Sequence, residues 1–435
     1  MTRRLAHAIN TLCVVLPLYN MYSIAKSKKL LLKASVVSTL ANNYTVMNDG
    51  KELTSSQQPP SLAYVVILIL ILAAVSQLVA VLLEWSRVQH YYDSKDSLKS
   101  LHHFIRDSGI FPTLMNFMSL QHVVPILLKY PGALWWKFQL YRHHRHVIRY
   151  GHQSSSQHVD LYLPSTDQDQ DNDQHVEGLI IFVHGGAWGS GSPAQYSIVA
   201  KPFLTINWAV AIVGYRLYPE GDASTQIVDL ELAISELARS YPHLFHNNNH
   251  VCLVGHSSGA HLCMLAMVER ARRELELSRT LSKHDLMVWK RNHQVPLNYM
   301  IGLSGPYNIL NHYEFETQRG VEQISPMSPA NGHSNNMFLR FSPAVQFRNL
   351  VCQCRSEEER HVLQKAFPPT TLIHGMNDET VPSSSTKVAA QLINSTGVAV
   401  CKEIYVDDLG HEETIVQVMF GGPVQDILTN LLQQQ

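Results

Sequence analysis

The chain has 435 residues, of which 45% are hydrophobic and 16% charged, and its formal net charge is −1. A chain of this length and apolar content can bury the core of one large domain or of two ordinary ones, and its near-neutral charge argues against a nucleic acid partner. Its six cysteines are scattered, so no disulfide framework is predicted, and Cys252 and Cys263 are expected in the core because they lie in apolar runs.

The first hundred residues (1–100) are predicted to form a membrane anchor. Residues 62–83 read LAYVVILILILAAVSQLVAVLL without one charged side chain. About 20 apolar residues suffice to cross the hydrocarbon layer of a bilayer, so we predict a transmembrane helix there. Residues 5–25 are compatible with a first span or with a cleaved signal. Basic residues flank both ends of that stretch, so the orientation of the chain across the membrane stays open.

Residues 101–146 are predicted to lie at the membrane surface. The stretch ALWWKFQLYRHHRHVIRY mixes tryptophans, which favour headgroup depth, with cations that can face lipid phosphate. No cysteine or carboxylate accompanies its histidines at ligand spacing, so a solvated basic face is favoured over a metal site.

From residue 147 to 435 the pattern is that of one α/β domain with a mostly parallel, doubly wound sheet. Continuous apolar strands separated by helical stretches, such as 227–240, indicate a sheet that is covered on both faces. The alternation of predicted strands and helices weakens between residues 270 and 365. We interpret this stretch as a lid-like insertion over the carboxyl ends of the strands. The predicted strands are 158–163, 178–184, 208–215, 251–255, 299–304, 370–375 and 402–406.

The segment VCLVGHSSGAHLC contains a candidate nucleophile. Residues 255–259 read Gly-His-Ser-Ser-Gly, between an apolar strand and a helical stretch. This is the context of G-x-S-x-G, in which small neighbours permit a sharp turn that exposes the serine oxygen. The helix that follows adds partial positive charge near a developing oxyanion. Ser257 is therefore the predicted nucleophile.

A second motif, FVHGGAWGSG, follows the apolar strand at 178–184. Its glycines let backbone N–H groups face a substrate oxygen without obstruction by a Cβ atom, as an acyl-transfer enzyme requires. The alternative is a tight turn between a strand and a helix. The paired glycines and the tryptophan at this point of the strand order favour the first interpretation.

The acid and the base are expected after the serine, in the order Asp and then His. LIHGMNDETVP supplies Asp378 after one strand, and IYVDDLGHEE supplies His411 after the last strand. Asp407 and Asp408 are rival acids, although their proximity to His411 in sequence makes it hard for them to orient its ring. Two further histidines near strand ends, His256 and His374, are less suitable as the base because neither follows the last strand.

Together HGGAW, YRLYPEG, GHSSGAH and HGMNDETVP resemble the hormone-sensitive-lipase-like branch of the α/β-hydrolases. RYGHQSSSQHVDLYLP, IGLSGPYNILNHYEF, RFSPAV and HGMND are more narrowly similar to the isoprenylcysteine α-carboxyl methylesterases. This resemblance covers about residues 147–420 and implies the α/β-hydrolase fold. Kynurenine formamidase and other small esterases share the His-Gly-Gly-x-Trp element.

The resemblance implies a membrane-anchored serine esterase that demethylates prenylated cysteine methyl esters in the endoplasmic reticulum or Golgi membrane. It assigns Ser257 as nucleophile, His411 as base and Asp378 as its partner. The implied oxyanion hole consists of backbone N–H groups of Gly185, Gly186, Ala187 and Ser258. Tyr215 and Arg216 are expected to brace their loop, and no metal or organic cofactor is implied. Alternatives are a general carboxylesterase or lipid deacylase, an arylformamidase, and a catalytically silent scaffold.

Overall fold

The computed structural model describes residues 129–130, 132–164, 176–245, 250–322 and 325–434. The predicted membrane helix at 62–83, the stretch at 5–25 and most of the segment at 101–146 lie outside these ranges. Within them, no helix has both the length and the apolar character needed to cross a bilayer.

One eight-stranded sheet organises the described part of the chain, in the order β1-β2-β4-β3-β5-β6-β7-β8. β1 pairs with β2 and β2 with β4 in antiparallel fashion, and all other neighbours are parallel. The prediction of a mostly parallel α/β sheet is therefore confirmed. The strands are β1 (Arg145–Arg149), β2 (His158–Tyr162), β3 (Gly178–Val183), β4 (Trp208–Val213), β5 (His250–His256), β6 (Tyr299–Leu303), β7 (Thr370–Gly375) and β8 (Cys401–Val406).

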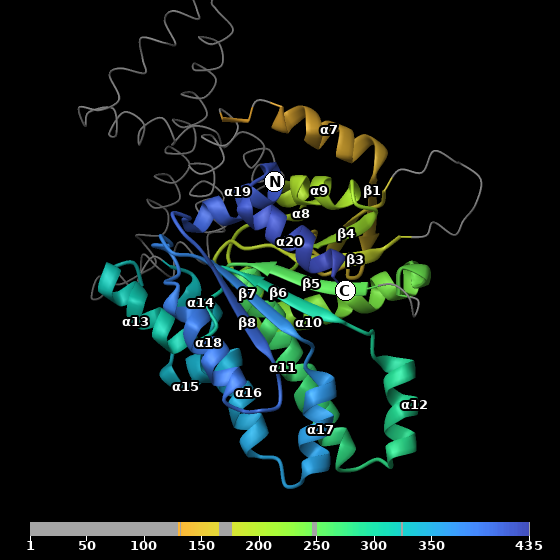
Figure 1. Ribbon diagram of the computed structural model, residues 1–435, viewed down its shortest axis with the longest axis vertical. Helices are drawn as coiled ribbons and strands as arrows, with labels where there is room; N and C mark the ends of the chain where they lie inside the picture. Colours follow the sequence, from red (N-terminus) through yellow and green to blue (C-terminus); the bar gives the residue numbers. More distant parts are fainter. Residues whose placement is uncertain (1–128, 131, 165–175, 246–249, 323–324, 435) are drawn as a thin grey trace, which may run out of the picture. The chain divides into compact units, whose positions relative to one another are not determined.

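Helices cover the sheet on both faces, as Figure 1 shows. α9 (Ala200–Leu204), α19 (His411–Phe420) and α20 (Pro423–Gln433) lie on one face, next to α7 (Ala133–His143), α8 (Pro193–Tyr196) and η1 (Ser197–Val199). On the other face are α10 (Ala223–Ser240), α11 (Ser258–Ser278), α16 (Pro343–Cys352), α17 (Glu357–Ala366) and α18 (Ser384–Asn394). η2 (Pro242–Phe245) follows α10.

The central strands are buried along their whole length because helices pack on both sides of them. Every residue of β3, β4, β6 and β7 is buried. Alternate residues, such as Ile180 and Phe182, point into a core shared with Phe203 of α9, Ile415 of α19 and Leu428 of α20. This two-sided burial explains why these strands read as continuous apolar runs.

The predicted insertion at 270–365 contains several kinds of structure. Its first residues complete α11, and α12 (Lys283–His293) then leads to the central strand β6. Between β6 and β7 lie α13 (Ile309–Arg319), α14 (Met327–Ala330), α15 (Asn335–Arg340), α16 and α17. That these helices act as a lid stays a prediction.

Candidate active site

Ser257 lies at the sharp turn between β5 and α11. Its backbone angles, φ 54° and ψ −126°, are in a region that few residues other than glycine adopt. A Cβ atom at Gly259 would overlap the carbonyl of Val183 and lie 2.5 Å from the carbonyl oxygen of His184. One at Gly255 would lie 2.5 Å from the carbonyl oxygen of Gly259. Both glycines are thus required because the start of α11 packs directly against β3 and β5.

The structure brings the three predicted catalytic side chains into one hydrogen-bonded row. His411 Nε2 lies 2.9 Å from Ser257 Oγ, and His411 Nδ1 lies 2.7 Å from Asp378 Oδ2. Asp378 follows β7, and His411 is the first residue of α19, after β8. All three residues are buried. The rival acids Asp407 and Asp408 are exposed, and His411 Nδ1 bonds to Asp378 instead.

The carboxylate of Asp378 is held by several donors at once. Its Oδ1 accepts the backbone N–H groups of Thr380 at 2.9 Å and Val381 at 2.8 Å, whereas Oδ2 faces the ring of His411 and, at 3.3 Å, that of His374. Burial alone raises the pKa of Asp378, but the hydrogen bonds from His374 and His411 outweigh burial and hold this pKa well below its ordinary value. Asp378 is therefore ionised at neutral pH.

His411 has a raised pKa for a related reason. Burial alone lowers the pKa of His411, whereas the hydrogen bond to Asp378 and the charge of Asp378 raise it, and the net result lies above the ordinary histidine value. Since Asp378 accepts the proton on Nδ1, Nε2 of the neutral ring is unprotonated and can accept the hydroxyl proton of Ser257.

The glycine loop after β3 lies directly against Ser257. A Cβ atom at Gly185 would be only 2.9 Å from the Cβ of Ser257. Gly186 has φ 128° and Ala187 φ 49°, so the backbone turns sharply there. Among the described residues, the N–H groups of Gly186, Ala187 and Ser258 have no hydrogen-bond acceptor. They are therefore free to donate to a substrate oxygen.

Trp188 anchors this loop in the core. Its Nε1–H donates to His261 Nδ1 at 3.2 Å, and His261 Nε2 lies 2.7 Å from the carbonyl oxygen of Phe341. The carbonyl of Trp188 accepts from the N–H of Tyr218 and from Nε2 of Gln226, both at 2.9 Å. Burial lowers the pKa of His261 to about 4, so its ring is neutral and can accept from Trp188. These contacts explain the tryptophan of the HGGAW motif.

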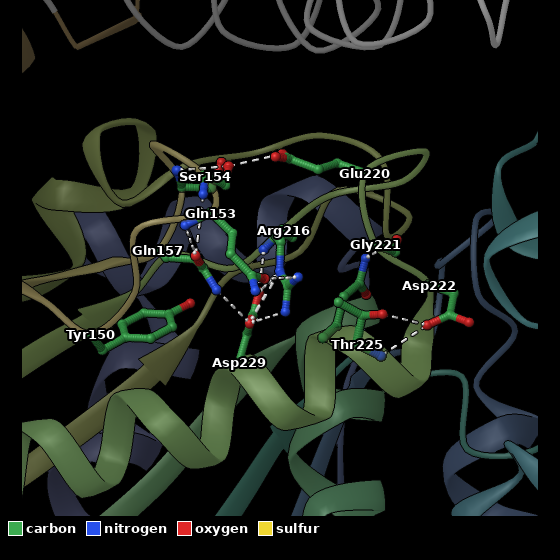
Figure 2. Close-up of polar contacts among 12 residues, drawn as sticks. Tyr150, Gln153, Ser154, Gln157, Arg216, Glu220, Gly221, Asp222, Thr225 and Asp229 are labelled. Carbon is green, nitrogen blue, oxygen red and sulfur yellow. Dashed lines mark hydrogen bonds and ion pairs between the residues drawn. The ribbon is translucent and has the colours of Figure 1, made fainter.

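Arg216 braces the neighbouring YRLYPEG loop, as expected from the sequence. Its guanidinium and backbone N–H bond to the buried carboxylate of Asp229 on α10, at distances from 2.7 to 3.2 Å. Gln157 donates to the same carboxylate and Gln153 accepts from Arg216, so both glutamines belong to this network, as Figure 2 shows. Tyr215 donates from its hydroxyl to the carbonyl of His184 at 2.8 Å. The network supports the loop and does not contact Ser257.

Two histidines that sequence reasoning set aside lie beside the candidate triad. His374 Nε2 is 3.3 Å from Asp378 Oδ2, and His256 Nε2 is 3.3 Å from the carbonyl oxygen of His411. Both are buried. Their position near strand ends was visible in the sequence, but their contacts depend on the packing of β5, β7 and α19.

The described part of the chain contains no cluster of three or more histidine, cysteine or acidic side chains that could hold a metal ion.

The model of the BD-FAE family matches residues 159–392. The chain is 26% identical over 288 residues to a probable isoprenylcysteine alpha-carbonyl methylesterase of Arabidopsis thaliana, covering 66% of this chain and 55% of that protein. It is 28% identical over 253 residues to the isoprenylcysteine alpha-carbonyl methylesterase of the same plant, covering 58% and 53%. The chain thus spans about half the length of these relatives. A solved structure, esterase B from Lactobacillus Rhamnosis, matches with a TM-score of 0.48 and 18% identity, covering 72% of this chain and 93% of that one.

Proposed function

The chain belongs to the BD-FAE family, and from this premise we propose that it is a serine hydrolase that cleaves carboxylic esters. The observation that carries the proposal is the row Asp378–His411–Ser257, in which both hydrogen bonds are shorter than 3 Å. The same row is the arrangement by which other serine hydrolases activate a hydroxyl group.

In the proposed reaction Ser257 Oγ attacks the ester carbonyl carbon while His411 Nε2 takes the hydroxyl proton. Asp378 stabilises the imidazolium that forms, through the proton on Nδ1. His411 then donates its proton to the leaving alcohol, and an acyl-enzyme remains on Ser257. A water molecule, deprotonated by His411, then attacks the acyl carbon, the bond from that carbon to Ser257 Oγ breaks, and His411 returns the proton to Oγ as the acid leaves.

The negative oxygen of the tetrahedral intermediate needs hydrogen-bond donors. We assign the free N–H groups of Gly186, Ala187 and Ser258 to this role, together with Gly185, whose close approach keeps the loop beside Ser257. Ser258 is the first residue of α11, so the positive end of the helix dipole adds to the stabilisation.

For the substrate we propose the methyl ester of a prenylated cysteine. The names of the two Arabidopsis relatives and the motifs shared with their family support this assignment. A membrane anchor at 62–83 would place the enzyme in the phase into which a prenyl chain partitions, and we propose an endoplasmic reticulum or Golgi membrane as its location. A general carboxylesterase or an arylformamidase is the alternative, because the triad itself does not select the acyl group.

The outer face of α7 supports contact with an anionic lipid surface. Trp135 is 59% and Phe138 51% exposed, and Arg142 lies on the same face of the helix. The helix is fixed to the domain through Trp136, whose ring lies 6.0 Å from that of Phe420, and Tyr130, which precedes the helix, stacks on the same ring at 4.2 Å. Residues 108–159 contain no aspartate or glutamate, so the charge of this region complements lipid phosphate.

Oxidative footprinting of the full chain in vesicles tests this surface. We expect Trp135 to be oxidised by hydroxyl radicals less in vesicles of phosphatidylcholine and phosphatidylserine than in phosphatidylcholine alone. Met287, 65% exposed on α12, is the internal control and should react equally in both. Equal oxidation of Trp135 in the two vesicle types would contradict the proposed lipid contact.

Turnover measurements test the proposed activity. The full chain and a Ser257→Ala variant are compared on a short p-nitrophenyl ester, a prenylcysteine methyl ester and N-formylkynurenine. We expect the variant to lose activity on every substrate that the chain hydrolyses, and kcat/KM to be highest for the prenylcysteine ester. A higher kcat/KM for another ester would support the assignment as a serine hydrolase but contradict the prenylcysteine ester as its substrate. No turnover of any of these substrates by the unmodified chain would favour the alternative that the chain is a catalytically silent scaffold.

A further inference from the structure

A second histidine contacts the carboxylate of the candidate triad. His374 Nε2 lies 3.3 Å from Asp378 Oδ2 and 2.9 Å from the carbonyl oxygen of Val381. On the other side of the ring, His374 Nδ1 lies 2.8 Å from Oγ1 of Thr386. The side chains of His374 and Asp378 are completely buried, so water does not compete for these contacts.

The partners of His374 define which of its nitrogens carries the proton. Nε2 faces two acceptors, a carboxylate oxygen and a carbonyl oxygen, so Nε2 carries the hydrogen. Nδ1 is then unprotonated and accepts from the hydroxyl of Thr386. His374, with Thr386 behind it, therefore extends the row of Ser257, His411 and Asp378 by one close polar contact, that between His374 Nε2 and Asp378 Oδ2 at 3.3 Å.

We propose that His374 is a positioning residue that shares Oδ2 of Asp378 with His411 and so limits the basicity of His411. His411 donates to Oδ2, and the Nε2–H group of His374 lies 3.3 Å from the same oxygen, so both imidazoles draw on its negative charge and help to fix the carboxylate rotamer. With His374 in place, Asp378 attracts the proton of His411 less strongly than it would with His411 as its only imidazole partner. The proposal rests on the function proposed above for the triad.

Other titratable groups also face His411. Glu412 and Glu413, which follow it on α19, raise its pKa, as Asp378 does. His256 on β5 has its ring centroid 5.1 Å from that of His411. None of these groups contacts Oδ2 of Asp378, so replacing His374 changes one contact of that oxygen and leaves these groups in place.

The test is an NMR titration of the Nδ1 proton of His411 in the full chain, paired with the pH profile of kcat/KM. His374→Phe keeps a planar ring and removes both nitrogens, whereas His374→Gln carries an amide N–H that can reach the Nε2 position. We expect the pKa of His411 to rise by about one unit in His374→Phe, because Asp378 loses a polar contact to its charged oxygen. The neutral fraction of His411 then falls, so kcat/KM at neutral pH should fall about tenfold. His374→Gln should remain close to the unmodified chain in both measurements.

An unchanged pKa of His411 in folded His374→Phe would overturn the proposal. If that variant does not fold, His374→Leu replaces it in the comparison with His374→Gln, because leucine fills the buried position without an N–H group. Equal pKa values of His411 in these two variants would also overturn the proposal. The titration does not depend on turnover, so failure of the proposed activity is recognised separately.

Discussion

Replacing Asp378 by asparagine should abolish almost all activity, because the structure dictates how the amide would be oriented. Oδ1 of Asp378 accepts two backbone N–H groups, at 2.9 and 2.8 Å. In Asp378→Asn the amide oxygen must occupy this position, since an NH2 group there would face two backbone donors, which cannot change tautomer as the imidazoles of His411 and His374 beside Oδ2 can. The NH2 group then points at Nδ1 of His411 and forces Nδ1 to act as an acceptor.

This orientation selects the wrong tautomer of the base. A neutral His411 that accepts at Nδ1 carries its proton on Nε2, which faces Ser257 Oγ at 2.9 Å and can no longer take a proton from it. We expect kcat to fall about 10⁴-fold, or about 5.5 kcal/mol of transition-state stabilisation. The assay is hydrolysis of a p-nitrophenyl ester at neutral pH, with a denaturation curve to show that the variant folds.

Asp407→Asn and Asp408→Asn are the matched controls, because they remove the same charge near His411 from exposed positions. Each should retain activity within about twofold, as surface substitutions do. A loss of less than tenfold in folded Asp378→Asn, or a larger loss in either control, would refute the assignment of the acid.

Three further outcomes are expected. Because the pKa of His411 is raised, the pH at which kcat/KM falls to half on the acidic side should lie above the ordinary histidine value of about 6.5. Activity is lost as the pH falls because the ring must be neutral to accept a proton, and a midpoint below about 6.5 would contradict the raised pKa. Gly259→Ala should reduce the free energy of unfolding in urea by about 3 kcal/mol, because its Cβ overlaps the backbone of β3. Its control Gly320→Ala, with nothing within 4 Å, should cost about 1 kcal/mol for its φ of 69°, and equal losses would exclude the clash. Trp188→Phe should reduce kcat/KM about tenfold by removing the Nε1–H that anchors the glycine loop, and an unchanged value would show that this hydrogen bond is dispensable.

The sheet could be predicted from sequence where its strands are buried on both faces. Seven of the eight strands lie within two residues of the predicted bounds, and continuous apolar runs mark β3, β4, β5 and β6 most clearly. β8, with Lys402 and Glu403 exposed, follows from its β-rich end Ile-Tyr-Val instead. β1 was missed, since RHVIR is short, has only Ile148 buried and carries charges at both ends. Its position depends on antiparallel pairing with β2, a tertiary contact that periodicity does not encode.

The candidate site can be predicted where its residues belong to short local sequence motifs. The turn at Ser257 and the glycines before Trp188 require particular residues next to each other in the chain, so they are visible in the sequence. The contact of His374 with Asp378 and the link from Trp188 through His261 are not. They connect residues whose distances are set by how β7, α11 and the helices after β6 pack.

Mass spectrometry of the intact full chain after treatment with a fluorophosphonate, followed by peptide mapping, tests the central assignment most directly. A serine activated by His411 should form one covalent phosphonyl adduct, located on Ser257 and absent from Ser257→Ala. A folded chain that gains no adduct, or gains it on a different serine, would contradict the assignment of this row as an active site.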